Sequence, residues 1–250
     1  MTIDLKGKKA LVTGASGQLG RVMARTLAAC GADVALNYFH NKTMAENIKE
    51  EIEKLGRRAM AVQADITDET EVYKMRDKIY NDFGQVDIVV NNAVIQYEWT
   101  TILEQNIHDF RSQFDSCIMQ SVLTAKAFMP AMTDRKAGRF IGINTECYAL
   151  CERRSGAYAA AKSGMNSLYQ VLAKEVGESG ITVNQVSPGW TISDRHREEK
   201  TDDSAYAATV PLKRRGTDQE IANVVLFLAS DLSSYVTGVN IPVCGGRVMV

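Results

Sequence analysis

Two residues whose side chains could move a proton, Tyr158 and Lys162, lie four positions apart in a run rich in alanine. Alanine favours helix, and at this spacing both side chains lie on one helical face, one turn apart. A phenol normally loses its proton near pH ~10, and an ammonium group held close to it lowers that pKa. The pair therefore predicts a phenol that exchanges a proton with an alcohol or carbonyl oxygen near neutral pH. A Tyr and Lys pair on an ordinary surface helix has the same spacing, so the rest of the chain must decide.

Length and composition exclude several classes of protein. At 250 residues and 45% hydrophobic content the chain can bury one large core, and we expect a single α/β domain over residues 1–250. The net charge of −1 gives no indication of a nucleic acid or an anionic membrane as partner. No apolar run approaches the ~20 residues that span a bilayer, and the N-terminus lacks the apolar region of a signal peptide. We therefore expect a cytoplasmic protein.

The five cysteines are scattered and odd in number, so they match neither a zinc motif nor a disulfide framework. They are Cys30, Cys117, Cys147, Cys151 and Cys244. We expect no metal site and a reducing compartment.

Short β-branched runs alternate with longer amphipathic stretches, which is typical of βαβ units and a parallel sheet. The predicted strands are residues 9–13, 33–37, 58–63, 86–90, 139–144, 182–186 and 239–243. The predicted helices run from the first glycine turn to about 30, then 43–55, 68–83 with Thr67 as N-cap, 106–132, through Tyr158 to about 179, and 218–229. Residues 190–210 are polar, charged and weakly periodic, so we expect a mobile segment that acts as a lid over the substrate.

Three glycines, Gly14, Gly17 and Gly20, follow the first predicted strand and open a helix. Glycines there allow a tight turn and let the backbone approach a pyrophosphate at the helix N-terminus. Asp65 follows the third strand, where its carboxylate is placed either to accept from an adenine amino group or to cap the next helix. Asn91-Asn92-Ala93 follows the fourth strand, at the sheet edge where ligands bind in such folds. The context indicates a nucleotide site.

Taken together, these features resemble the short-chain dehydrogenase/reductase superfamily in its single-domain branch, and in particular its 3-oxoacyl-ACP reductase-like members. The matching motifs run in order over essentially the whole chain. They are Thr13-Gly14 with the glycine turn, Asp65, Asn91-Asn92-Ala93, Tyr158-x-x-x-Lys162, Asn184, Pro188-Gly189, and Tyr235-Val-Thr-Gly238 through Gly245-Gly246. The resemblance implies a doubly wound Rossmann fold with a seven-stranded parallel sheet and helices on both faces. It also implies a nicotinamide dinucleotide and, commonly, a homotetramer.

The resemblance assigns four catalytic roles. Tyr158 would be the acid/base, and Lys162 would lower its pKa and hold the nicotinamide ribose. Thr145, thirteen residues before the tyrosine, takes the place of a serine that orients the substrate carbonyl. Cys117 aligns with an asparagine that supports a water molecule in the proton relay. A thiol is a weak donor and a weak acceptor, so the relay would be altered here.

The resemblance also places cofactor contacts at the carboxyl edge of the predicted sheet, together with Tyr158 and Lys162. They are Gly14, Ser16, Gly17, Gln18, Leu19, Gly20, Tyr38, Asp65, Ile66, Asn91, Ala93, Pro188, Gly189, Ile192 and Ser193. Gln18 departs from the family pattern because a glycine usually stands there, and Ser193 stands where a threonine is usual.

The end of the second predicted strand bears on the choice of cofactor. An acidic residue there would bond a ribose 2′-hydroxyl and repel a 2′-phosphate. The sequence has no acid at this point, and His40 and Lys42 lie close by. This favours NADP(H) over NAD(H).

Polar, charged and aromatic residues follow the predicted strand ends that should surround the nicotinamide. They are Gln96, Tyr97, Trp99, Glu146, Tyr148, Glu152, Arg153, Arg154 and Trp190. Of these, Glu146, Arg154 and Trp190 are the candidate substrate contacts. The mixture favours a small polar carbonyl or alcohol, such as a sugar, a polyol or a hydroxy acid. Arg195, His196 and Arg197 either cap an acidic substrate or form a solvated surface cluster.

Three other functions remain open from the sequence. The first is reduction of a 3-oxoacyl thioester, the default comparison within the family. The second is a dinucleotide-binding regulator with little catalysis, which the departures at Gln18 and Cys117 keep open. The third, an extended-type epimerase, is disfavoured because the chain lacks residues for a second, substrate-binding domain.

Overall fold

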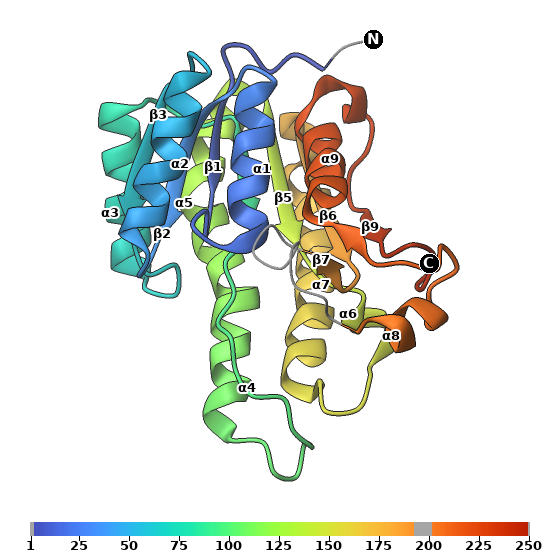
Figure 1. The fold of residues 1–250 in the computed structure, drawn as a ribbon. Helices are drawn as coiled ribbons and strands as arrows, with labels where there is room; N and C mark the ends of the chain where they lie inside the picture. The colour runs from blue at the N-terminus through green and yellow to red at the C-terminus, as the bar shows by residue number, and fades with distance from the viewer. Residues whose placement is uncertain (1–2, 193–201, 250) are drawn as a thin grey trace.

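The computed structural model describes residues 3–192 and 202–249, and its centre is a seven-stranded parallel sheet (Figure 1). The strand order is β3-β2-β1-β4-β5-β6-β9, and each neighbouring pair is parallel. The strands are β1 (Lys9–Val12), β2 (Asp33–Tyr38), β3 (Ala59–Gln63), β4 (Ile88–Asn91), β5 (Gly138–Ile143), β6 (Ile181–Pro188) and β9 (Asn240–Val243). This is the doubly wound order, which confirms the predicted fold class.

Helices cover both faces of the sheet. One apolar core joins it to α1 (Gln18–Ala29), α2 (Lys42–Lys54) and α9 (Asp218–Ala229). The second core joins it to α3 (Glu69–Asp82), α5 (Gln120–Arg135) and α7 (Gly156–Val176). Alternate residues of one strand serve the two cores: Ile88 and Val90 belong to the first, and Val89 to the second.

Shorter elements surround the carboxyl edge of the sheet. α4 (Ile107–Phe114) precedes a π-helical turn, Asp115–Met119, which leads into α5; both α4 and the start of α7 extend past this edge (Figure 1). The others are α6 (Cys147–Leu150), α8 (Ser204–Thr209), and the parallel pair β7 (Thr191–Ile192) and β8 (Gly216–Thr217). The 3-10 turns at Gly177–Ser179 and Asp231–Ser233 lie at the opposite, amino edge, the first just before β6 and the second paired with Arg139 at the start of β5. No helix in the described ranges is long and apolar enough to cross a membrane.

Two details differ from the sequence-based expectation. The helix expected over 106–132 is interrupted by the π-helical turn and continues to Arg135. Thr67 as the N-cap of α3 is wrong: the side chain of Asp68 accepts from the N–H of Glu71 at 2.8 Å. Thr67 instead donates its backbone N–H and its hydroxyl to Asp65 Oδ1, at 2.8 and 2.7 Å. A carboxylate two residues upstream therefore takes Thr67 out of the cap.

Candidate active site

Helix α7 places Tyr158 and Lys162 at the carboxyl edge of the sheet. The Lys162 ammonium lies 5.6 Å from the centroid of the Tyr158 ring, so both side chains share one face of α7. Lys162 is 2% exposed, and its Nζ donates to the carbonyl of Ile143, the last residue of β5, at 2.6 Å. The backbone N–H of Tyr158, in the first turn of α7, donates to the hydroxyl of Tyr97 at 3.0 Å.

The net shift of the Tyr158 pKa in this structure is upward, opposite in direction to the lowering expected from Lys162. Burial raises the pKa of the Tyr158 phenol above its usual value, and the nearby Cys117 and Cys147 raise it further. A hydrogen bond with Thr145 acts in the opposite direction. Burial also lowers the pKa of Lys162, whose ammonium is held by a backbone carbonyl. Tyr158 is therefore a protonated acid at neutral pH.

Thr145 follows β5 and lies beside the phenol. Its backbone N–H donates to the Asn144 side chain at 2.9 Å, and its hydroxyl accepts from the N–H of Cys147 at 3.3 Å. The Thr145 hydroxyl acts to lower the pKa of Tyr158, so the two hydroxyls lie near each other. A substrate oxygen there could be bonded by both.

Cys117 lies in the π-helical turn and is fully buried. It affects the pKa of both Tyr158 and Lys162, so the structure brings it to the same site. Its backbone carbonyl accepts from the Ser121 hydroxyl at 3.1 Å. Single π-helical turns inside α-helices often occur at functional sites. Cys117 thus lies near the pair, and its part in a proton relay stays a prediction.

The glycine turn is held close to β4. Gly14 has φ +59°, and a Cβ there would lie 2.9 Å from the Ala93 Cα. A Cβ on Gly20 would lie 2.3 Å from the Gly14 carbonyl oxygen, so both positions require glycine. Gly17 is the N-cap of α1 and has no side chain. In the described part of the chain, no side-chain hydrogen bond from the N-cap position caps the start of this helix. The first turn of α1 therefore offers backbone N–H groups for an anion.

Gln18 does not disturb this turn. It is the first residue of α1, where any side chain fits a helical backbone, so the missing glycine leaves the turn intact. Ser16 and Leu19 flank it and are half-buried, at the same end of α1. All three lie where the sequence placed the cofactor.

Asn37 is a site residue that sequence analysis missed. Its side-chain oxygen accepts from the N–H of Gly14 at 3.2 Å, and its backbone oxygen accepts from Ala15 at 2.8 Å. Its amide nitrogen donates to the Ala64 carbonyl at 3.1 Å. The side chain thus joins the glycine turn to β2 and β3. A lone amide just after the apolar run Val34-Ala35-Leu36 of β2 was the available signal.

The residues at the ends of β2 and β3 that were predicted to contact or select the cofactor differ in their exposure. Tyr38 and Ile66 are buried, at 6% and 7% exposure. Asp65 is half-buried, and its Oδ1 is already engaged by the turn at Thr67. His40 and Lys42 are exposed just past the end of β2.

The Asn91 side chain does not face the cofactor region. It is 1% exposed, donates to the Tyr169 hydroxyl at 3.0 Å and accepts from the Thr124 hydroxyl at 2.9 Å. Both ends of the Asn91 amide therefore anchor α5 and α7, and the contact of Asn91 with the cofactor stays a prediction. The neighbouring Asn92 instead donates to the carbonyls of Thr13 and Gly14 at 3.0 and 3.2 Å.

The end of β6 lies against β9 and the loop after β5. The Pro188 carbonyl accepts from the N–H of Glu146 at 2.9 Å, and the Gly189 N–H donates to the Val243 carbonyl at 3.1 Å. Ile192 lies in β7 and is half-buried. Ser193, like Arg195, His196 and Arg197, lies outside the described residues.

Glu146 as a substrate contact is wrong. Its carboxylate is buried and pairs with Arg247 Nη1 at 2.7 Å, and the Tyr206 hydroxyl donates to it at 3.1 Å. Arg247 also pairs with Glu152. The charge of Glu146 is thus used within the protein by an arginine from the C-terminal tail, which sequence analysis did not consider.

Trp190 and Arg154, the other two candidate substrate contacts, are both exposed. Trp190 is 45% exposed, donates its backbone N–H at 2.8 Å to the same Tyr206 hydroxyl that bonds Glu146, and lies under the guanidinium of Arg215 at 4.0 Å. Arg154 is exposed, with φ +72°, and its charge acts on Glu104. Neither side chain lines the pocket at Tyr158.

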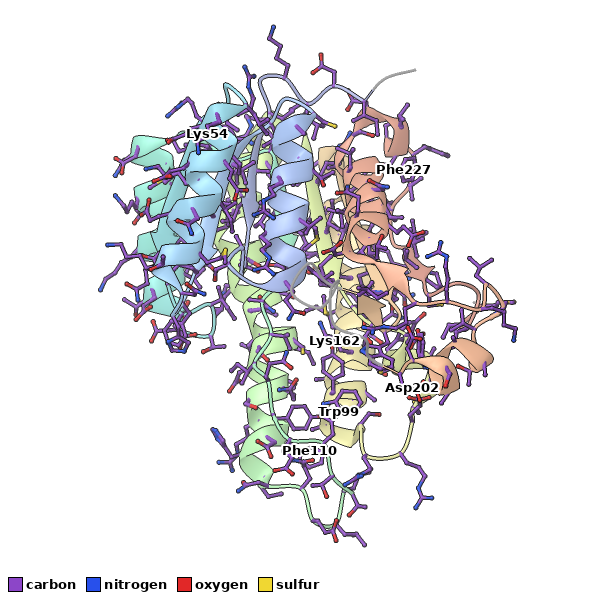
Figure 2. The ribbon with its side chains drawn as sticks, in the orientation of Figure 1. Lys54, Trp99, Phe110, Lys162, Asp202 and Phe227 are labelled. Carbon is purple, nitrogen blue, oxygen red and sulfur yellow. The ribbon has the colours of Figure 1, made fainter. Side chains whose placement is uncertain are left out.

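That pocket, of about 100 Å³, lies beside the phenol. It is lined by Val94, Ile95, Gln96, Tyr97, Trp99, Gln113 and Tyr158. The Trp99 ring lies 5.7 Å from the Tyr158 ring and stacks on Tyr97 at 6.3 Å (Figure 2, between α4 and α7). Gln96, Tyr97 and Trp99 are confirmed as neighbours of the site, while Gln113 from α4 was missed.

Comparison with known proteins agrees with this geometry. A family model described as "Enoyl-(Acyl carrier protein) reductase" matches residues 14–247. The chain belongs to the short-chain dehydrogenase/reductase family. It is 36% identical to a 3-oxoacyl-[acyl-carrier-protein] reductase of Staphylococcus epidermidis, over 97% of this chain and 99% of that one. It is 38% identical to the enzyme of that name from Escherichia coli, over 99% and 100%.

Several solved structures share the fold over nearly the whole chain. A blue fluorescent protein from a metagenomic library, in complex with NADPH, has a TM-score of 0.91 at 33% identity, covering 98% of this chain and 100% of that one. A putative gluconate dehydrogenase from Agrobacterium tumefaciens reaches 0.93 at 31% identity and full coverage of both. A 7α-hydroxysteroid dehydrogenase complexed with NADH reaches 0.91 at 30% identity, covering 99% and 96%. The chain is an oxidoreductase of this family.

Proposed function

We propose that this chain is an NADP(H)-dependent oxidoreductase that interconverts a carbonyl group and a secondary alcohol on a compact polar substrate. The observation that carries the proposal is the meeting of three groups at the carboxyl edge of the sheet. The Tyr158 phenol, the Thr145 hydroxyl and the buried Lys162 ammonium converge beside a pocket that opens next to the phenol. A bound nicotinamide supplies or accepts the hydride.

The protein's own residues manage the oxygen and the proton. Because burial keeps the Tyr158 phenol protonated, it donates its proton to the substrate oxygen as negative charge develops there. The Thr145 hydroxyl bonds the same oxygen and orients the carbonyl. Lys162 has three N–H donors and gives one to the Ile143 carbonyl and one to the Met165 sulfur, which leaves one for the nicotinamide ribose. In the reverse direction Tyr158 must first lose its proton, which needs higher pH.

Exposed charge supports the cofactor preference. His40 and Lys42 lie just past β2, whose Asn37 bonds the glycine turn, and the sequence from Leu36 to Lys42 has no acidic residue to repel a 2′-phosphate. The NADPH in the structure of the metagenomic protein agrees with this choice, and the NADH in that of the hydroxysteroid dehydrogenase represents the alternative.

The pocket supports a compact substrate. Its volume of about 100 Å³ is small, and its lining combines two glutamine amides with aromatic rings. A sugar, polyol or hydroxy acid fits this lining, and the neighbour described as a putative gluconate dehydrogenase points the same way. The second candidate is a 3-oxoacyl thioester, which the names of the relatives at 36–38% identity favour. The family's common homotetramer is our expectation for the assembly, to be measured by light scattering.

The test is a titration of the purified protein with NADPH and NADH, followed by nicotinamide fluorescence. A panel of sugars, polyols, keto acids and 3-oxoacyl thioesters is then added. We expect tighter binding of NADPH and oxidation of the cofactor with a hydroxylated ketone. Turnover confined to the thioester would replace the first candidate by the second. Binding without turnover on any class would refute the enzyme and leave a dinucleotide-binding regulator.

A further inference from the structure

One buried acceptor at the pocket has no partner among the described residues: the side-chain oxygen of Gln113. Gln113 is fully buried on α4, and its amide nitrogen donates to the Ile95 carbonyl at 2.8 Å. A carbonyl can only accept, so this bond fixes the orientation of the amide and turns Oε1 away from Ile95. Buried acceptors are nearly always paired, so one left open beside a catalytic phenol calls for a donor.

The neighbours of Gln113 define what that donor belongs to. Gln113 and Tyr158 line the same pocket, and the Trp99 ring lies over Tyr158. The residues lining this pocket carry no charged side chain. Trp99, which lines the same pocket, is 41% exposed, so its ring can turn aside for a substrate without loss of a fully buried contact. Aromatic rings, in turn, stack on the flat faces of cyclic molecules.

We propose that Gln113 Oε1 accepts a hydrogen bond from a second hydroxyl group of the substrate, while the substrate's ring packs against Trp99. The substrate class is then an uncharged cyclic hydroxy ketone or the corresponding polyol, rather than a hydroxy acid. This subsite rests on the proposed function, because it orients the same carbonyl that Tyr158 protonates. It makes Gln113 a specificity-determining residue.

The test compares cyclohexanone with its isomeric hydroxycyclohexanones, using NADPH oxidation by the whole protein as the readout. We expect one hydroxylated isomer to exceed cyclohexanone about tenfold in kcat/KM, the scale of one hydrogen bond. Gln113→Met keeps the side-chain length but removes the acceptor, so the ratio between the two substrates should fall to about one. Gln113→Asn, which withdraws the acceptor by one methylene, is the second variant and should also lower the ratio.

The control variant is Gln105→Met. Gln105 holds the same loop, since it accepts from the Thr100 N–H at 3.1 Å and donates to the Glu98 carbonyl at 3.1 Å, but it does not line the pocket. If Gln105→Met loosens the loop, it should lower kcat/KM for both ketones by the same factor. The ratio between the two ketones should then stay as in the wild type. A merely structural role for Gln113 predicts the same pattern for Gln113→Met, and that result would overturn the subsite.

Two further outcomes separate the subsite from the proposed function. Equal turnover of all the ketones by the wild-type protein would overturn the subsite and leave the proposed function standing. NADPH binding with no turnover of any ketone would overturn both.

Discussion

Replacing Arg247 by Met should destabilise the protein strongly, because it leaves a buried carboxylate without its cation. The Glu146 side chain is 5% exposed and that of Arg247 15% exposed, with 2.7 Å between Oε1 and Nη1. Methionine keeps most of the length and apolar stem of the arginine, so the variant removes charge more than volume. The Tyr206 hydroxyl remains as a donor to Glu146, at 3.1 Å.

The expected loss in the free energy of unfolding is about 3 kcal/mol, the lower end for a buried pair that loses one partner. Glu152 adds little to this figure because its side chain is 42% exposed and water replaces its partner. For a chain of this length the loss corresponds to a fall in Tm of roughly 6–12 °C. The double variant Glu146→Gln, Arg247→Met should recover about 2 kcal/mol, since a neutral amide still accepts from Tyr206.

The assay is equilibrium unfolding in urea, followed by far-ultraviolet circular dichroism at one fixed protein concentration. Glu152→Gln is the control and should change the midpoint little. A loss below about 1 kcal/mol in Arg247→Met would refute the reasoning, since it would mean that the pair is solvated. So would a double variant no more stable than the single one.

Three further predictions concern the glycine turn, the pH profile and acid stability. Gly20→Ala should lower the free energy of unfolding by about 1–3 kcal/mol and weaken NADPH binding, since the new Cβ would lie 2.3 Å from a carbonyl oxygen. Gly17→Ala, whose Cβ would lie 3.1 Å from its nearest atom, should be much milder in both assays. Because the raised pKa keeps Tyr158 protonated, ketone reduction should stay level from about pH 6 to about pH 9 while alcohol oxidation rises; a reduction rate that falls above neutral pH would contradict this. Hydrogen bonds from Arg214 and from the Thr217 N–H lower the pKa of Glu220 to about 2, so its stabilisation is present above its unfolded pKa and is lost as the pH falls toward 2. Between about pH 5 and pH 2 the wild-type Tm should therefore fall more steeply than that of Glu220→Gln, and parallel curves would refute this assignment.

The fold could be predicted from the sequence because its signals are local. Most strands of the parallel sheet are short runs of largely apolar residues, and the helices repeat their apolar residues at helical spacing. The glycine turn was also local, since Gly14 and Gly20 lie in one turn whose close approach to β4 requires glycine. Asp68, and not the predicted Thr67, caps α3, because Thr67 is bonded to Asp65. Sequence spacing alone could not show that Asp65 would compete for Thr67.

The candidate site was harder to predict where it depends on contacts distant in sequence. Glu146 and Arg247 are 101 residues apart, so nothing local showed that the carboxylate was already paired. The Lys162 ammonium was expected to act on Tyr158, yet the end of β5 offers it a carbonyl at 2.6 Å. Gln113 reached the pocket only because α4 packs beside the loop after β4. Sequence spacing predicted which residues share a helix face. Packing between distant segments decided which of those side chains are already bonded within the protein.

The most direct test of the account is Tyr158→Phe, which removes one hydroxyl and keeps the ring. The glycine turn and the end of β2 are untouched, so titration with NADPH should give wild-type affinity. Ketone reduction should fall at least about a hundredfold, the scale of a lost general acid. Thr145→Val, which removes the other hydroxyl at the same point, should also slow turnover without changing NADPH binding. Turnover by Tyr158→Phe within twofold of the wild type would contradict the account, because the proton would then come from another group.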